Sequence, residues 1–553
     1  MNIRSTITVV LLAVAISPAC NSIRDIDRAK KSIKTGDLAR QVAVLAADSF
    51  MGRQPFTPGE SLTIQYLASE LERMGYEPAF GGSWFQEVPM TEIRSEVTNP
   101  VAVNTGKETL YFNSPDDIAV TSPLTEEQIE VSSSEIVFAG FGIVAPEYGW
   151  NDYQYLDVKG KTVIVLVNDP GLYTGNPDLF KGREMTYYGR WTYKFEEAAR
   201  QGAEGILIIH ETTGAGYEYT IPRKSSISPR LQLSSNEKAE GCSFAGWLSA
   251  SAAEELFGKI GMNVSLLREE ACKKEFRGFK TNASLSMTIS NLIQTNSSSN
   301  VAGVLRGSLY PDEAIVYTAH WDHFGVGEPE NGDSIYNGAV DNGTSMAWAF
   351  EIAEAFTLLN KRPERSILIL FPTAEEQGLL GSSWYAANPV FDPELTVACF
   401  NNDLLLPIGR MRDIMITGYG QSDLDSLVAQ LAEKQDRYIL PDPNPHTGMY
   451  FRSDHFPFAA KGIPAMFARG NCDSRENGKE WAAAQELDYL NNRYHRPADN
   501  YEPDQWDFEG IKEDAILMFE AGLILANSRY FPRWKSGSEF SGIRERNRLL
   551  LTK

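Results

Sequence analysis

Short apolar runs alternate with a helical run in the second half of the chain. Residues 300–305, 314–319 and 365–371 are strand-like, whereas residues 345–359 have the apolar spacing of a helix. Alternation of this kind predicts an α/β sandwich, in which helices cover a sheet and functional side chains follow the carboxyl ends of its strands. We therefore expect the residues that close these runs to form a site.

Acidic residues and histidines lie in five short motifs in this half of the chain. In chain order, the motifs contain His320, Asp341, the pair Glu375 and Glu376, Asp403, and His495. Each motif alone has a plainer explanation, as when Asp341 is interpreted as the N-cap of the following helix. Their combination of imidazole and carboxylate without thiolate indicates a metal site that suits zinc best, with cobalt or manganese as alternatives.

The adjacent carboxylates of Glu375 and Glu376 follow an apolar strand, where burial without a cation would be costly. One carboxylate can bind a metal ion while its neighbour accepts a proton from a bound water. Asp322, two residues after His320, is a candidate for orienting the His320 imidazole through a hydrogen bond to its carboxylate, without binding the metal itself.

The order and local context of these motifs resemble the co-catalytic di-zinc aminopeptidase family, which includes bacterial leucyl aminopeptidases, aminopeptidase Y and glutamate carboxypeptidase II. The resemblance implies two zinc ions per chain, one bound by His320 and Asp403 and the other by Glu376 and His495. It also implies that Asp341 bridges both ions and that Glu375 is the general base. The implied fold is an α/β/α sandwich of the phosphorylase/hydrolase-like type.

Two further matches concern the surroundings of the metal ions. The segment that contains Arg452, Asp454 and His455 resembles the family's Arg-Ser-Asp-His segment, with Arg452 facing substrate and the other two behind the ligands. Tyr494 is similar in position to a tyrosine that stabilises the oxyanion in some relatives. A purely structural role is an equal alternative for each of these four residues.

Residues 123–279 are rich in predicted strands and resemble a protease-associated domain inserted into the peptidase domain. The predicted organisation is therefore an N-terminal part of the peptidase domain over 21–122, the insert over 123–279, the main part over 287–535 and a loosely docked tail over 536–553. The tract from Ser297 to Ser299 is interpreted as a short polar linker.

The N-terminus has Arg4, an apolar run over residues 7–16 and then Cys20, which predicts a secretory signal over residues 1–20. The position of Cys20 is typical of a bacterial lipoprotein signal, so we expect an exported protein of the periplasm or cell envelope with a lipid anchor at this residue, or a secreted one. An exported chain could also form a disulfide between Cys242 and Cys272.

The net charge of −22 disfavours nucleic acid as a partner, and peptides are the expected substrates. The leading function is an aminopeptidase that hydrolyses N-terminal residues through a metal-activated water. Carboxypeptidase or dipeptidase specificity is open within the same chemistry. Further alternatives are a glutaminyl-peptide cyclotransferase with one zinc ion and a noncatalytic, receptor-like binding protein on the same scaffold.

Overall fold

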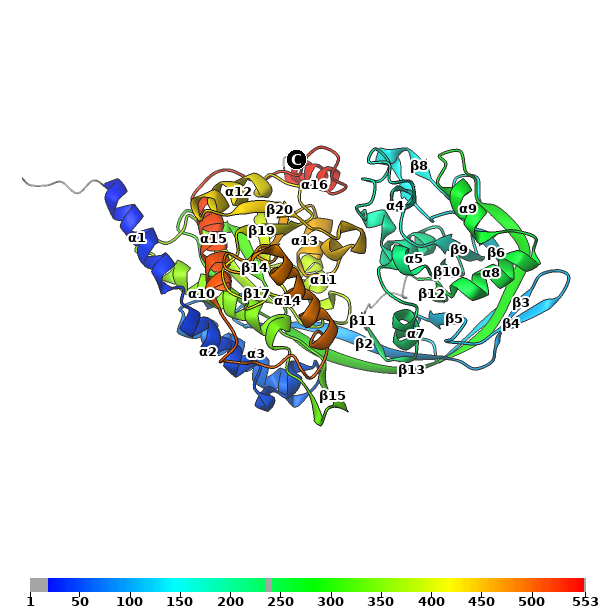
Figure 1. Cartoon of the computed structure of the whole chain (residues 1–553), viewed down its shortest axis with the longest axis horizontal. Coiled ribbons are helices and arrows are strands. Elements are labelled where there is room, and N and C mark those ends of the chain that lie inside the picture. Colours follow the sequence, from blue (N-terminus) through cyan, green and yellow to red (C-terminus); the bar gives the residue numbers. More distant parts are fainter. Residues whose placement is uncertain (1–17, 235–240, 552–553) are drawn as a thin grey trace, which may run out of the picture.

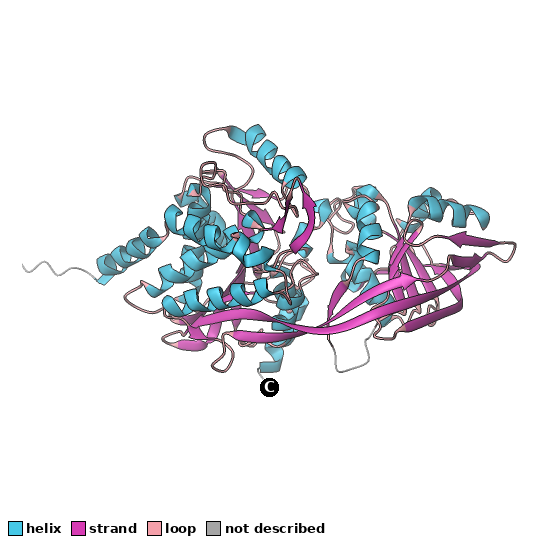
Figure 2. Cartoon of the chain, turned by 90° about the horizontal axis from the view of Figure 1, so that it is seen from below, coloured by secondary structure: helices cyan, strands magenta, loops and turns pink. Residues whose placement is uncertain are grey.

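The computed structural model describes residues 18–234 and 241–551, which form two lobes joined by a long pair of antiparallel strands (Figures 1 and 2). The two strands are β2 (Phe85–Val97) and β13 (Phe279–Leu305). At about 3.3 Å per residue, β13 extends for roughly 85 Å and contributes to the sheets of both lobes. Within the described ranges, we find no helix with the length and apolar character that a membrane span requires.

The larger lobe contains a mixed sheet in the order β13-β17-β14-β18-β21-β19-β20. Strands β14, β17, β18 and β21 are parallel, whereas β13 and β19 run antiparallel to their neighbours β17 and β21. The bounds of the other strands of this sheet are β14 (Tyr310–Thr318), β17 (Arg365–Phe371), β18 (Thr396–Asn401), β19 (Asp413–Thr417), β20 (Tyr438–Pro441) and β21 (Ala465–Arg469). The short strand β1 (Glu77–Pro78) pairs with the C-terminal end of β13.

Helices cover both faces of this sheet. In β17, Ile367 and Ile369 belong to one apolar core, while Leu368 and Leu370 belong to another on the opposite face. The first core includes helices α1 (Pro18–Ser32), α2 (Thr35–Leu45), α3 (Pro58–Arg73), α10 (Ser345–Thr357), α12 (Leu424–Lys434) and α15 (Glu509–Ala526), and the second includes α11 (Leu380–Ala387) and α13 (His455–Ala460). The predicted mixed α/β architecture is therefore confirmed for this lobe.

The smaller lobe is built on strands in the order β6-β9-β10-β12-β5 and on the hairpin β3-β4. Its strands are β3 (Val101–Asn104), β4 (Thr109–Phe112), β5 (Ile118–Thr121), β6 (Gln128–Phe138), β9 (Thr162–Leu166), β10 (Gly205–Ile209) and β12 (Phe244–Leu248), and its helices of eight or more residues are α5 (Trp191–Arg200), α7 (Thr220–Ile227), α8 (Ala250–Lys259) and α9 (Val264–Ala271). Its core includes Val101, Leu110 and Val120. The lobe therefore begins earlier in the chain than residue 123, the predicted start of the insert.

The tract from Ser297 to Ser299 is not a linker, because it lies within β13 and pairs with β2. Ser298 is buried, and its hydroxyl donates a hydrogen bond to Glu60 Oε1 at 2.8 Å. A strand accepts such polar residues when their side chains find partners. The prediction of a linker, which was based on polar composition alone, is therefore wrong.

The C-terminal segment packs against the larger lobe more closely than a loose tail would. Phe540, just before α16 (Ser541–Leu551), is buried in the second core. The Arg544 guanidinium donates hydrogen bonds to the carbonyls of Pro393 and Thr396. The possible disulfide is absent, because Cys242 and Cys272 are both free thiols.

Candidate metal centre

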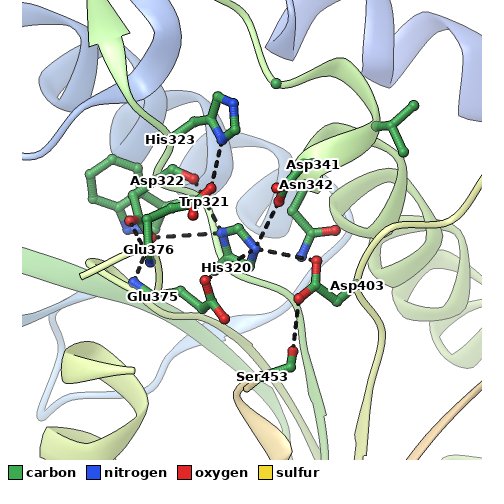
Figure 3. Close-up of polar contacts among 12 residues, drawn as sticks. His320, Trp321, Asp322, His323, Asp341, Asn342, Glu375, Glu376, Asp403 and Ser453 are labelled. Atoms are coloured by element: carbon green, nitrogen blue, oxygen red, sulfur yellow. Dashed lines mark hydrogen bonds and ion pairs between the residues drawn. The ribbon is translucent and has the colours of Figure 1, made fainter. Parts of the chain in front are cut away.

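Three neighbouring parallel strands bring the first site residues together. His320 follows the end of β14 by two residues, Glu375 and Glu376 follow β17, and Asp403 follows β18 by two residues. Because β14 lies between β17 and β18 in the sheet, these side chains converge at one edge (Figure 3). These four candidate site residues therefore lie at the carboxyl ends of the strands, as expected from the sequence.

Asp341 and His495 reach the same edge from loops. Asp341 lies in the short π-helical turn η4 (Ala339–Thr344), directly before α10. His495 follows α14 (Gly478–Asn492) and has a left-handed backbone with a φ of 57°. The carboxylate of Asp499 connects the two loops, because it accepts hydrogen bonds from the backbone N–H groups of Val340 and Asp341 at 3.0 and 3.1 Å.

The side chains form two adjoining sets that share Asp341. In the first, His320 Nε2 lies 3.3 Å from Asp341 Oδ1 and 3.4 Å from Asp403 Oδ1. In the second, His495 Nε2 lies 3.3 Å from Asp341 Oδ2 and 3.2 Å from Glu376 Oε2. Ligands at about 2.0–2.1 Å from a tetrahedral zinc ion are separated by about 3.3–3.4 Å. The ligand spacing in both sets therefore fits a tetrahedral ion of this size.

Unpartnered polar atoms support the same conclusion. His320 Nε2, Asp403 Oδ1 and His495 Nε2 are buried and make no hydrogen bond. A buried polar atom without a partner loses its hydration without compensation. A cation in the first set would satisfy His320 Nε2 and Asp403 Oδ1, and a cation in the second would satisfy His495 Nε2, so the residues present fit divalent metal ions.

The carboxylates and imidazoles at the centre strongly perturb one another. Burial alone would lower the pKa of His320, but the charges of Glu375 and Asp403 raise it well above its ordinary value. Burial likewise opposes the charged form of His495, yet Glu376 and Asp341 raise its pKa to about 10. Burial favours a high pKa for Asp341, but its contacts with the two histidines hold that pKa well below the usual range. The group is therefore a compact set of opposite charges, as expected where a cation binds.

Glu375 stands beside the two sets rather than within them. Its Oε2 lies 3.8 Å from His320 Nε2. Burial raises the pKa of this carboxyl well above its usual range, in opposition to the nearby His320. The Asp322 carboxylate accepts hydrogen bonds from the backbone N–H groups of Glu375 and Glu376 at 3.0 and 3.4 Å and so holds this turn in place.

The orientation of His320 depends on the backbone of Asp322. His320 Nδ1 lies 3.1 Å from the Asp322 carbonyl oxygen and 3.8 Å from its carboxylate. Asp322 is thus adjacent to the imidazole, as predicted, but its carbonyl is the hydrogen-bonding group. Its carboxylate instead accepts the hydrogen bonds from the backbone of the turn that contains Glu375.

The other predicted residues differ in how close they come to the centre. Tyr494 stacks on the His495 ring, with 3.6 Å between centroids. Asp454 is buried and accepts a hydrogen bond from the Ser382 hydroxyl at 2.5 Å. His455 packs between the rings of Tyr450 and Phe467, and burial lowers its pKa to about 3. The contacts of His455 are therefore those of a neutral core residue.

Four residues that support the centre were not predicted. His323 Nδ1 lies 2.7 Å from Glu376 Oε1, and the Ser453 hydroxyl donates to Asp403 Oδ2 at 2.9 Å. Asp499 holds the Asp341 turn, as described above. Arg53 is fully buried and donates to the backbone carbonyls of the loops behind His320 and Asp341. His323 and Asp499 lie within four residues of a predicted ligand, whereas nothing in the local sequence connects Arg53 with the site.

A cavity of about 260 Å³ adjoins the centre. Leu404 and Tyr494, the sequence neighbours of Asp403 and His495, form part of its wall. Further lining includes the charged side chains of Asp442, Arg452, Arg469 and Glu486, and the backbone of Gly216 from the smaller lobe. The cavity therefore lies where the two lobes meet, next to the candidate metal ligands.

A comparison with known protein families matches the part of the chain that holds the centre. Residues 300–519 match Peptidase family M28. Aminopeptidase NAALADL1 of Mus musculus is 33% identical over 131 residues, 23% of this chain and 16% of that protein. Carboxypeptidase Q of Mus musculus is 33% identical over 109 residues, 20% of this chain and 21% of that protein. The chain thus spans about a fifth or less of the length of these relatives.

An aminopeptidase structure from Aneurinibacillus sp. strain AM-1 aligns with a TM-score of 0.47 at 17% identity, over 90% of this chain and 95% of that one. All six predicted metal-site residues, from His320 to His495, lie within the matched residues 300–519. The resemblance inferred from the motifs is confirmed: residues 300–519 of this chain are a peptidase family M28 domain.

Proposed function

We propose that the chain is an exported exopeptidase that uses two zinc ions to remove N-terminal residues from peptides. The observation that carries this proposal is the position of Asp341. Its two carboxylate oxygens are divided between His320 and Asp403 on one side and His495 and Glu376 on the other. A carboxylate placed in this way can bridge two metal ions.

The donor set supports zinc. Two imidazoles and three carboxylates, without a thiolate, suit an ion of borderline softness. Zinc ions bound there would lower the pKa of a water molecule and polarise the scissile carbonyl. His320 and Asp403 would hold one ion and His495 and Glu376 the other, with Asp341 between them.

Glu375 is the proposed general base. Its carboxylate lies beside both ligand sets without belonging to either, so it can accept the proton of the attacking water at Oε2 and return it to the leaving amine. The Asp322 carboxylate keeps the Glu375 backbone in position. The Tyr494 hydroxyl is the proposed donor to the oxyanion, since its ring is fixed by stacking on His495.

N-terminal specificity is the finer part of the proposal. An open metal position can bind a free α-amine, and an ammonium group in the adjoining cavity would also find the carboxylates of Asp442 and Glu486. The relatives include both an aminopeptidase and a carboxypeptidase by name, so substrate cleavage must decide between the two.

The smaller lobe is proposed to be a protease-associated domain that shapes the substrate entrance. Gly216 of this lobe lines the cavity beside the metal centre, and the Met185 N–H donates a hydrogen bond to the Pro445 carbonyl of the larger lobe. Export rests on residues 1–20, which lie outside the described residues apart from the backbone of the first turn of α1. Replacement of Cys20 with Ser should release the protein from the membrane fraction if this residue is lipidated.

The decisive experiment incubates the zinc-loaded protein with matched free and N-acetylated peptides and follows the products by mass spectrometry. Loss of single N-terminal residues from free peptides only is the expected result. C-terminal trimming would instead favour a carboxypeptidase, and ammonia loss from N-terminal Gln would favour a glutaminyl-peptide cyclotransferase. No change in any peptide would favour a noncatalytic binding protein.

The variant Glu375→Gln tests the base. It should lose turnover by about 10²- to 10⁴-fold while it retains two zinc ions per chain, because the amide cannot accept the proton of water. Zinc content is measured by elemental mass spectrometry in the same preparation. Unchanged turnover would refute the assignment of Glu375, and a stoichiometry of one would refute the two-ion centre.

A further inference from the structure

A second cavity, of about 230 Å³, lies in the smaller lobe on the side that faces the larger lobe, and three arginines line it. Arg190 directly precedes α5, Arg230 begins β11 (Arg230–Leu233), and Arg452 comes from the larger lobe. The lining also includes the aromatic rings of Trp191, Phe195, Tyr217 and Trp247 and the hydroxyl groups of Thr121, Ser225 and Ser226. We call this space the arginine cavity.

The three arginines have no acidic partner among the described residues, and no acidic residue lines the cavity. Arg230 Nη1 donates to the Thr121 hydroxyl at 3.2 Å, and its guanidinium lies 5.8 Å from the Trp191 ring centroid. Arg190 lies 5.7 Å from the same ring, and Arg452 lies 5.8 Å from that of Tyr217. The cavity therefore gathers three positive charges that only neutral groups contact.

Such a cluster is unfavourable without an anion. Burial lowers the pKa of Arg190 to about 9, and the charge of Arg452 adds to the effect. Buried charges are stabilised when an opposite charge with matching hydrogen-bond geometry is present. In a chain with a net charge of −22, an uncompensated positive pocket indicates a place for an anionic ligand.

The arginine cavity adjoins the cavity beside the metal centre. Arg452 lines both, and the consecutive residues Gly216 and Tyr217 line one each. Ser453, next to Arg452 in the chain, donates a hydrogen bond to the Asp403 carboxylate. A ligand at the metal centre that extends through the 260 Å³ cavity would therefore approach these arginines.

We propose that the arginine cavity binds a carboxylate of the peptide substrate, with Arg190 and Arg230 as specificity-determining residues together with Arg452. This inference rests on the proposed exopeptidase function. A guanidinium fork matches the planar carboxylate, and the aromatic walls favour a carboxylate carried on an organic chain. The carboxylate is either the C-terminus of a short peptide or an Asp or Glu side chain.

The first test measures binding without cleavage. N-acetylated peptides with a free C-terminus are compared with their C-terminal amides, and peptides with an internal Glu with those that have Gln, by isothermal titration calorimetry. The acid of at least one pair should bind about tenfold more tightly, as one additional charge-assisted hydrogen bond predicts. The pair that shows the difference identifies the source of the carboxylate, and equal binding in all pairs, or no binding by any acid, overturns the proposal.

The variant Arg230→Gln should abolish this preference. The matched control is Arg223→Gln, because Arg223 lies in the same lobe but pairs with Asp116 outside the cavity. Arg190→Gln serves as a second variant if Arg230→Gln fails to fold. Thermal unfolding provides an independent reading: loss of one of three like charges should leave the unliganded variant at least as stable as the wild type. Retention of the preference in a folded variant overturns the assignment.

Inorganic phosphate is the competing anion. If phosphate binds with an affinity that Arg230→Gln abolishes, while acids and amides bind equally, the cavity is a phosphate site and the carboxylate assignment is wrong. Cleavage rates separate this inference from the proposed function. If N-acetylated acids bind preferentially but the same peptides with a free N-terminus are not cleaved, the exopeptidase proposal fails and the carboxylate site stands. If free peptides are cleaved at equal rates as acids and as amides, and acids and amides bind equally, the exopeptidase proposal stands and the carboxylate site is wrong.

Discussion

Replacement of Arg53 with Met should destabilise the larger lobe and weaken the metal centre, although Arg53 is not itself a ligand. Its guanidinium donates to the carbonyls of Leu45, Trp321, Asn337 and Gly338 at 2.8, 2.9, 2.5 and 2.9 Å. Burial lowers the pKa of Arg53 to about 10, in opposition to nearby carboxylates, so the group is still charged at neutral pH. Trp321 and Gly338 belong to the loops that position His320 and Asp341.

The magnitude follows from the four hydrogen bonds. Methionine fills the space but leaves four buried carbonyls without this donor, at about 1 kcal/mol each, or about 4 kcal/mol in total. At an unfolding entropy of about 2.1 cal/mol/K per residue, for a lobe of more than 300 residues, that corresponds to a decrease in Tm of about 5–6 °C. Differential scanning calorimetry measures the decrease, and chelator titration measures zinc affinity on the same samples.

The control is Arg53→Lys, which keeps the charge and one donor group. It should fall between the wild type and Arg53→Met in both Tm and zinc affinity, because an ammonium group cannot reproduce the fork that reaches four separate carbonyls. If Arg53→Met unfolds and binds zinc like the wild type, the guanidinium does not organise these loops and the reasoning is wrong.

Three further predictions concern the centre and the core. Asp499→Asn should weaken zinc binding by about 10- to 100-fold with little loss of Tm, because the carboxylate holds the backbone of Asp341 rather than the metal; unchanged affinity in a chelator titration would contradict it. Asp341→Asn should lose both ions together, whereas Asp403→Asn should lose one first, as elemental analysis can show. Glu351 is buried, and burial raises its pKa to about 8 from an ordinary 4.5. The folded state therefore holds a proton that the unfolded state releases, and stability should fall by at most about 5 kcal/mol between pH 4.5 and 8. Glu351→Gln should be more stable than the wild type at pH 8.5 and close to it at pH 4.5 in urea unfolding.

The sequence was sufficient to predict which side chains converge at the candidate metal centre. His320, Glu376 and Asp403 follow apolar strands, and the geometry of parallel strands brings their carboxyl ends to one edge. Asp341 and His495 reach the edge from loops, so their convergence was inferred from the order of motifs and not from a physical rule. The supporting residues Arg53 and Ser453 were not predicted, because they act across the fold through contacts that no local pattern encodes.

The organisation of the smaller lobe was predicted less accurately for a related reason. Composition placed its start at residue 123, but Val101 and Leu110 complete its core. The polar tract at Ser297 resembled a linker, although each of its residues pairs with β2. The partner of a strand and the core that a residue joins depend on residues more than a hundred positions away. The hydrophobic periodicity of one segment does not contain this information.

The shared strands also bear on how the smaller lobe can influence substrate choice. Because β2 and β13 run without interruption from one lobe into the other, a rotation between the lobes would disrupt a continuous ladder of backbone hydrogen bonds. Contacts such as the ion pair between Lys181 and Glu539, at 3.1 Å, further fix the lobes where they meet. Arg190 and Arg230 are therefore held at a set position relative to the metal centre. A rigidly positioned charge selects substrates by length as well as by charge, since only a peptide whose carboxylate reaches the arginines while its scissile bond lies at His320 gains from both contacts.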